Sequence, residues 1–437
     1  CHIIPKAPER FVMRRFRIHG FVLMAVALAA CASNEGEQSQ NSTARLPESP
    51  GTADYYNQVE RIASDYVTRF DDLPLAGKVS RIPWTDTYWP KNKGGITYRW
   101  QTGESHDYAS PSRDEALAMS SAQLGLLSPS EKLDLIAGNY HYALTEREKS
   151  RNTKSTPSWQ GYCHGWTPAS IHFEEPLPVV VQNPDGLEIP FGSSDIKALL
   201  SYYQGEVVQN FYATPDLTFV QPVHVMGSVC SSNSPVDSSC FDVNPGSFHV
   251  VMSNQIALRD EAFGIDATNT AEKWNQPVHT FSSEVLLSRS PREGANPLAV
   301  EEHVVRSRVI YTQEIEPQWE ATSGTSAHAD HEKTYTYSVE VDGEGHVVGG
   351  QWLYLGDGHE GIALHAAVKQ LRQEDTNGDG VADHSEDEME QIIWHHFDFP
   401  DYVWKHGKQP FSETFVQAPS AYAFLAPSAT MYKNLYG

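Results

Sequence analysis

The sequence of 437 residues has few basic residues, few cysteines and no long apolar run away from its N-terminus. Its 32 Lys and Arg residues face 56 Asp and Glu residues, which gives a formal net charge of −24. Because phosphate binding needs a basic face, this balance argues against nucleic acid as a partner. No stretch beyond the N-terminus is apolar for long enough to cross a bilayer. With 40% hydrophobic and 11% aromatic residues, the composition is typical of a globular protein.

The N-terminus carries the pattern of a bacterial export signal. A basic stretch at Met13–Arg17 precedes the apolar run Phe21–Ala30, and the small residues before Cys31 fit a lipobox. This pattern predicts that residues 1–30 are upstream sequence and signal peptide, and that Cys31 receives lipid; an ordinary secretory signal is the alternative. The polar residues 31–52 are expected to form a flexible tether. The predicted location is the bacterial cell envelope, with the lipid as the membrane anchor and the outer membrane as its site, or outside the cell.

The five cysteines leave one thiol without an assigned role. Cys1 lies upstream of the signal, and Cys31 is the predicted lipidation site. Cys230 and Cys240 enclose a polar loop, and in an oxidising compartment we expect them to form a disulfide. Cys163 remains, and an odd thiol in an exported protein indicates catalysis. A buried structural cysteine is the alternative.

Cys163 lies in the stretch Trp159–Trp166, where glycines and tryptophans flank the thiol on both sides. The residues Thr167–Ser170 behind it can begin a helix, and a helix N-terminus stabilises a thiolate. A thiol nucleophile also needs a base that takes its proton and a third group that orients the base. Histidines and carboxylates are therefore the candidates for the rest of the site.

Among 19 histidines, His249 has the best context for a base. It lies in the apolar stretch Gly246–Val251, where a strand would hold the imidazole rigidly. A second short apolar stretch ends at Asp266, and two adjacent antiparallel strands would set this carboxylate beside His249. Asp260 and Asp242 are competing acids in more polar settings. A satisfied strand histidine is the alternative for His249.

The predicted elements run from helices to strands, which indicates an α+β fold. Helical spacing and capping signals predict helices at 55–70, 112–125, 130–147 and 194–204. Runs of β-branched and aromatic residues predict strands at 248–256, 304–315, 334–341 and 347–355. A short extended run is expected at 96–100.

Several motifs in this order resemble the transglutaminase elicitor family of oomycete cell-wall enzymes. Lys273–Val278 is similar to the core of the peptide elicitor in that family. Tyr162–Trp166 matches its Tyr-Cys-His-Gly-Trp motif, and Phe248–Val250 matches its Phe-His-Val motif. The likeness extends over residues 80–355, so the chain is identified as a bacterial homologue.

The resemblance implies a papain-like core with a triad of Cys163, His249 and Asp266. The implied reaction is acyl transfer: the Cys163 thiolate attacks the γ-carboxamide of a protein glutamine, ammonia leaves, and a lysine or other amine converts the thioester into an isopeptide. A cysteine protease or a protein glutaminase (deamidase) with the same triad is one alternative. A non-enzymatic envelope lipoprotein is the other.

Transfer to an amine requires that water be kept from the thioester. We expect the walls of such a channel, for which core packing is the alternative, at Trp159, Trp166 and Trp274. Backbone N–H groups near Cys163, together with Gln160, are expected to stabilise the oxyanion.

A second predicted site follows the region of likeness. The segment from 375 to 386 has the ligand spacing of an EF-hand loop, with Gly380 at the sharp turn. The predicted Ca²⁺ ligands are Asp375, Asn377, Asp379, Val381, Asp383 and Glu386. A solvated acidic turn is the alternative. We thus predict a catalytic domain at 53–360, with a helical N-terminal part, and a C-terminal segment at 361–437 that packs on it and binds calcium for stability or regulation.

Overall fold

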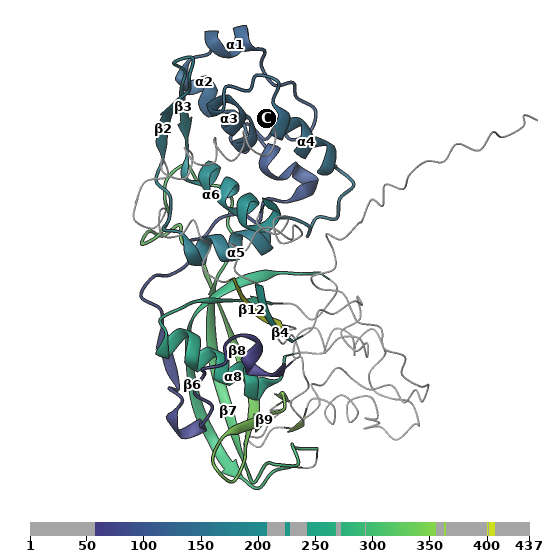
Figure 1. Cartoon of the computed structure of the whole chain (residues 1–437), viewed down its shortest axis with the longest axis vertical. Helices are drawn as coiled ribbons and strands as arrows, with labels where there is room; N and C mark the ends of the chain where they lie inside the picture. The colour runs from purple at the N-terminus through teal and green to yellow at the C-terminus, as the bar shows by residue number, and fades with distance from the viewer. Residues whose placement is uncertain are drawn as a thin grey trace, which may run out of the picture. The chain divides into compact units, whose positions relative to one another are not determined.

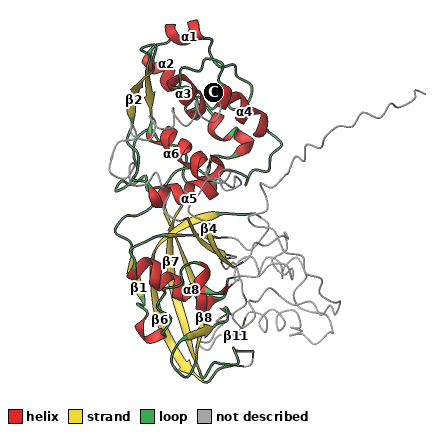
Figure 2. Ribbon diagram, viewed as in Figure 1, coloured by secondary structure: helices red, strands yellow, loops and turns green. Residues whose placement is uncertain are grey.

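The computed structural model describes residues 57–207, 223–227, 243–267, 272–292, 294–354, 362–363, 400 and 402–406 (Figure 1). The signal segment with Cys31, the Cys230–Cys240 pair and the calcium loop from Asp375 to Glu386 lie outside the described residues. The described residues form a mixed fold of helices and antiparallel strands (Figure 2). This agrees with the predicted α+β class.

Helices dominate the first half of the described chain, and serine caps start several of them. Ser112, Ser120 and Ser128 each accept a hydrogen bond from the backbone three residues on, and the Glu or Gln at that position bonds back to the capping residue. The helices are α1 (Arg113–Ala118), α2 (Ser121–Gly125), α3 (Pro129–Ile136), α4 (Ala143–Arg151), α5 (Cys163–His172) and α6 (Ser193–Tyr202), which continues into the π-turn η7 (Tyr203–Val207). A two-stranded ribbon joins β2 (Val179–Gln182) to β3 (Glu188–Phe191).

The second half is organised by an antiparallel sheet of eight strands. Its order is β4 (Val223–Gly227), β12 (Tyr402–His406), β5 (Phe263–Asp266), β6 (Asn275–Arg289), β7 (Glu301–Thr312), β8 (Asp330–Val341) and β9 (Val347–Gly349), while β1 (Ala76–Lys78) pairs with β6. A separate pair joins β10 (Leu353–Tyr354) to β11 (Ile362–Ala363). Helix α8 (Pro245–Met252), extended by the π-helix η8 (Ser253–Leu258), packs on β8 and β9.

Several predicted elements are confirmed and others are wrong. The helix at 194–204 and the strands at 304–315 and 334–341 correspond to α6, β7 and β8. The helix predicted at 112–125 divides at the extended residue Met119, and the helix at 130–147 divides near Gly138, whose φ is +71°. The strand at 347–355 divides into β9 and β10. Residues 55–70 and 96–100 contain short 3₁₀ turns: η3 (Val59–Arg61), η4 (Phe70–Asp72) and η6 (Gly95–Thr97).

The strand predicted at 248–256 is wrong, because these residues form α8 and η8. Asn244 caps α8 by accepting hydrogen bonds from the N–H groups of Gly246 and Ser247 at 3.0 and 3.3 Å. Pro245 occupies the first turn of α8, where backbone N–H groups have no partner within the helix, so the lack of an N–H in proline costs no hydrogen bond. The buried apolar residues Phe248, Val251, Met252 and Ile256 follow helical spacing. A capped start therefore overrides the β propensity of the valines.

Among the described residues, two hydrophobic clusters form the core. One lies between the sheet and α8 and includes Phe248, Tyr337 and Trp352, and the other lies among the helices and includes Trp89 and Trp166. Helix α5 packs against α6 and also against β5 and β6, so its first residue lies where helices and sheet meet. Every described helix is too short or too polar to span a membrane.

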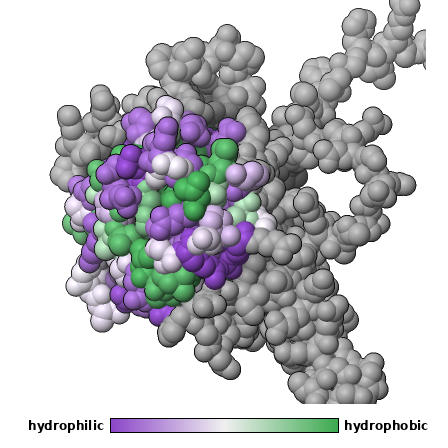
Figure 3. All heavy atoms as spheres, turned by 90° about the horizontal axis from the view of Figure 1, so that it is seen from below, coloured by the Kyte–Doolittle hydropathy of each residue, from purple (hydrophilic) through white to green (hydrophobic). Residues whose placement is uncertain are grey.

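Exposed apolar side chains of the described residues are few. On the face shown in Figure 3, apolar side chains form several groups with polar side chains between them. Exposed apolar side chains of the described residues include Val285, Leu298 and Val300, on β6 and in the connection to β7. Single exposed apolar residues are ordinary on protein surfaces, so we assign no partner to them.

Candidate active site around Cys163

The thiol of Cys163 occupies the first residue of α5, so the helix begins before the predicted start at Thr167–Ser170. Both flanking glycines are required by close backbone contacts. A Cβ atom on Gly161 would lie 2.4 Å from the Tyr88 carbonyl oxygen, and one on Gly165 would lie 1.9 Å from the Ser201 carbonyl oxygen in α6. The thiol is therefore held on a tightly packed turn.

Hydrogen bonds from the start of β6 hold the thiol. Cys163 Sγ donates to the Lys273 carbonyl oxygen at 3.4 Å, and Asn275 Nδ2 donates to Sγ at 3.5 Å. Thr167 Oγ1, one turn further along α5, donates to the Asn275 carbonyl oxygen at 2.8 Å. Cys163 is 5% exposed and Asn275 is 4% exposed. The residue that contacts the thiol is thus itself buried and bonded back to the helix that carries the thiol.

Two carboxylates of the described residues lie near the strand residues that hold this thiol. Asp266 ends β5 directly opposite Asn275 in the β5–β6 register and accepts the Trp274 N–H at 2.9 Å. Glu314 follows β7, and both of its carboxylate oxygens accept from Gln276 Nε2 at 2.8 Å. Burial raises the pKa of Glu314. Acidic groups and neutral amides therefore surround the thiol.

Burial raises the pKa of Cys163 to about 11. Hydrogen bonds from Asn275 lower this pKa, while the charges of Glu314 and Asp266 raise it further. The sequence had suggested that the helix N-terminus would stabilise the thiolate, but loss of hydration outweighs that effect. At neutral pH the resting group is a protonated thiol, which needs a base before it can attack.

His249 lies in the cluster beneath the sheet rather than in contact with Cys163. Its Nδ1 bonds to the Tyr337 hydroxyl at 2.8 Å, and its ring stacks on Phe70 with centroids 5.6 Å apart. Burial lowers the pKa of His249 to about 4, so the ring is neutral. The predicted pairing of His249 with Asp266 assumed two adjacent strands, and because His249 is on α8 that geometry is wrong. The structure brings together Cys163 and Asp266, and it does not bring His249 to them.

Other histidines do not fill this place in the described part of the chain, where no imidazole is hydrogen-bonded to Cys163. His164 adjoins the thiol in sequence, but burial lowers its pKa to about 4 and the charge of Glu206 acts on it. His279, on β6, bonds to Asp330 at 3.1 Å. Neither ring is therefore hydrogen-bonded to Cys163 in the described residues.

The predicted channel residues differ in their environment. Trp166 is fully buried in the helical cluster, which is the packing alternative. Trp274 lies edge-on to the Tyr88 ring, with centroids 5.3 Å apart, directly before the thiol partner Asn275. Trp159 and Gln160 are half-buried, and the Gln160 carbonyl oxygen accepts the Lys91 N–H at 2.8 Å. Of the three tryptophans, Trp274 is the one whose neighbours also bond to the thiol.

Sequence reasoning missed Asn275, Gln276 and Glu314. The first two belong to the elicitor-like stretch, which signalled family likeness but not contact with the thiol. Asn275 lies 112 residues from Cys163, and Gln276 lies 38 residues from Glu314. These contacts depend on how α5 docks on β6, which no local pattern encodes.

Comparison with known proteins agrees with the motifs. Residues 60–361 match the family described as transglutaminase elicitor. The crystal structure of the GP42 transglutaminase from Phytophthora sojae is similar, with a TM-score of 0.52 and 20% sequence identity over 85% of this chain and 96% of that chain. No curated protein matches the chain. At this identity the structural likeness concerns the mixed helix and antiparallel-sheet fold.

Proposed function

Because the chain belongs to the transglutaminase elicitor family, we propose that it transfers the acyl group of a protein glutamine to an amine through a thioester on Cys163. The observation that carries the proposal is the buried thiol at the start of α5, with the Asn275 amide bonded to Sγ. A buried thiol suits acyl transfer, because water competes with the amine for the thioester. The family implies protein substrates.

In the first step, Sγ loses its proton and attacks the glutamine γ-carbon. The Asn275 amide group is placed to donate to the oxyanion that forms beside Sγ. First-turn N–H groups of α5 supply further partial positive charge there. The C–N bond then breaks, ammonia leaves with the transferred proton, and the thioester remains.

The base for this step is assigned to His249 by the family motif. That role requires the imidazole to leave Tyr337 and approach the thiol, since the described contacts hold it beneath the sheet. The assignment stays a prediction, with Asp266 as the acid beside the thiol. His249→Ala tests it: ammonia release falls to background if the ring is the base, and stays at the wild-type rate if the ring only packs on Phe70.

The direct test of the function uses the full chain with a glutamine-containing protein and a fluorescent primary amine. Mass spectrometry follows both the amine adduct and the glutamate formed by deamidation. Amine incorporation that Cys163→Ala abolishes supports transfer. Deamidation or peptide cleavage without incorporation would instead favour the hydrolase alternatives, and absence of every product would favour the binding lipoprotein.

Three further proposals depend on sequence alone, because their residues lie outside those described. The lipobox supports lipidation of Cys31 in the bacterial envelope, and the oxidising compartment supports a Cys230–Cys240 disulfide. The spacing of Asp375, Asn377, Asp379, Val381, Asp383 and Glu386 supports a calcium loop. Mass spectrometry of the intact chain under non-reducing conditions checks the first two.

Calcium binding is checked through the last ligand. Glu386 occupies the position that binds Ca²⁺ with both carboxylate oxygens, so Glu386→Gln is expected to weaken binding. Isothermal titration of the full chain measures this, with Glu388→Gln, two residues beyond the loop, as the matched control. A titration that Glu386→Gln leaves unchanged would rule the loop out.

A further inference from the structure

Two short segments hold Glu314 close to the residues that contact the thiol. Residues on either side of it are bonded to the segment before Trp89: the Gln313 carbonyl accepts from Thr85 Oγ1, and the Ile315 N–H donates to the Asp86 carbonyl at 3.0 Å. Its carboxylate is held by Gln276, the neighbour of Asn275. Two consecutive residues at the start of β6 therefore hold the thiol and the carboxylate respectively.

The charge of Glu314 is not neutralised by the group that holds it. Gln276 donates through a neutral amide, at 2.8 Å to both oxygens. Burial is the main cause of the raised pKa values of Cys163 and of Tyr88, and the charge of the Glu314 carboxylate raises both further. Asp266 adds negative charge on the same thiol. The surroundings of Sγ thus favour a cation.

This arrangement is unsuitable for stabilising the thiolate, since a second anion nearby opposes ionisation of the thiol. It suits a positively charged reactant that arrives after the thioester has formed. Glu314 itself is half-buried rather than closed off, so an extended side chain can reach it. An alkylammonium group is such a reactant, and it must lose a proton before its nitrogen can attack.

We propose that Glu314 binds the ammonium group of the acyl acceptor and takes its proton, which makes cationic amines such as the lysine side chain the preferred acceptors. The inference rests on the proposed acyl transfer and adds the acceptor site to it. Gln276 positions the carboxylate, and Tyr88 with Trp274 form the wall beside it.

The proposed step balances in atoms and charge. The ammonium gives one proton to the Glu314 carboxylate and becomes a neutral amine. Its nitrogen attacks the thioester carbon, the C–N bond forms and the C–S bond breaks. The sulfur leaves as thiolate and receives the second proton from the attacking nitrogen, which regenerates the thiol and leaves a neutral amide. Glu314 then releases its proton to solvent.

The test compares two nucleophiles in the full chain of wild type and Glu314→Gln. A fluorescent alkylamine is a cation at neutral pH and needs both binding and deprotonation. Hydroxylamine is neutral at the same pH and needs neither. We expect Glu314→Gln to lower kcat/KM for alkylamine by about 100-fold, the usual contribution of a general base, while hydroxamate formation and ammonia release are not lowered.

Glu316→Gln is the matched control. It removes the same charge two residues away, but the Glu316 side chain is 79% exposed and lies 4.0 Å from Lys93. We expect it to leave both nucleophiles unaffected. Glu314→Asp keeps the charge on a shorter side chain and is expected to restore part of the alkylamine activity, and thermal melting reports whether each variant is folded.

The outcomes separate this inference from the proposed function. Wild-type alkylamine activity in Glu314→Gln would overturn the acceptor site while leaving acyl transfer intact. An equal loss with both nucleophiles would overturn it as well, since Glu314 would then support the thiol rather than the amine. A wild-type chain that releases no ammonia and forms no hydroxamate would overturn the acyl transfer and the acceptor site together.

Discussion

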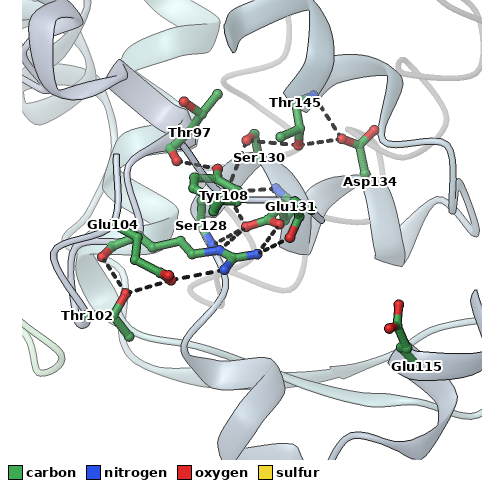
Figure 4. A network of polar contacts seen from close by, with 12 residues as sticks. Thr97, Thr102, Glu104, Tyr108, Glu115, Ser128, Ser130, Glu131, Asp134 and Thr145 are labelled. Carbon is green, nitrogen blue, oxygen red and sulfur yellow. Dashed lines mark hydrogen bonds and ion pairs between the residues drawn. The ribbon is translucent and has the colours of Figure 1, made fainter. Parts of the chain in front are cut away.

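Two glutamates of this protein are held in opposite ways. Glu131, in α3, is 0% exposed and accepts hydrogen bonds from the Arg99 guanidinium at 2.9 and 2.7 Å and from the Ser128 N–H at 3.0 Å (Figure 4). Burial alone would raise the pKa of Glu131, but Arg99 outweighs it and lowers the pKa. Glu314 has a neutral amide as its partner, and its pKa is raised.

This difference in partner distinguishes carboxylates that stabilise the fold from carboxylates that can bind a ligand or take part in catalysis. Other buried acids of the helical part also face cations, as in the pairs of Asp195 with Lys132 at 2.6 Å and of Glu175 with Lys197 at 2.5 Å. The negative charge of a carboxylate that is already paired is offset by its cation. Glu314 has no cation as its hydrogen-bond partner and lies near a buried thiol, so it is a candidate catalytic group.

The largest effect is expected from removing the thiol. Cys163→Ala should lower amine incorporation by at least about 10⁴-fold, because it removes the sulfur that carries the acyl group in the proposed thioester. The rate is measured with a fluorescent amine, and a thermal melt serves as the folding control. Incorporation that survives the substitution would show that the catalytic centre lies elsewhere in the chain.

The contribution of Glu131 to the stability of the fold is tested by breaking its ion pair with Arg99. Arg99→Met leaves a buried carboxylate without its cation, and we expect the free energy of unfolding to fall by about 3–5 kcal/mol. Denaturant titration measures the change. The matched variant is Arg113→Met, whose ion pair with Asp185 is exposed, so that little or no change in the free energy of unfolding is expected. An equal fall in the free energy of unfolding in both variants would show that the buried ion pair contributes no more than the exposed one.

How much of this arrangement was readable from the sequence depends on the range of the interactions. Capping signals are local, so Ser128 and the residues after it predicted the start of α3 closely. The cap at Asn244 and Pro245 carried the same kind of signal for α8, but the β-branched residues after it pointed to a strand instead. Weighing helical spacing above β propensity would have corrected the placement of His249.

The site was predictable only in part for the same reason. Cys163 followed from cysteine accounting and from a local motif, and Asp266 followed from the end of an apolar stretch. Asn275 and Glu314 meet the thiol through strand register and helix docking, which are set by the whole core. A shift of one residue in β6 would turn Asn275 away from Sγ, and no local pattern fixes that choice.

An intermediate effect is expected at Asn275. Asn275→Ala removes the amide that donates to Sγ, and kcat should fall by about 100-fold with KM little changed, as for loss of one oxyanion donor. Thr167→Val provides the control, because it removes a bond to the Asn275 backbone and leaves the amide in place. A KM effect without a kcat effect would assign Asn275 to substrate binding instead.

The smallest expected effect concerns the rate at which the resting thiol is alkylated. Because burial raises the pKa of Cys163 to about 11, alkylation by iodoacetamide should be slow at neutral pH and should accelerate as the pH rises towards that value. Glu314→Gln removes a charge that opposes ionisation, so alkylation at neutral pH should become a few-fold faster, while Glu316→Gln should leave it unchanged. The same substitution is expected to slow transfer to alkylamines. A group that merely supported the thiol would move both rates in one direction, so opposite changes in one variant would identify Glu314 as a group that acts on the incoming amine.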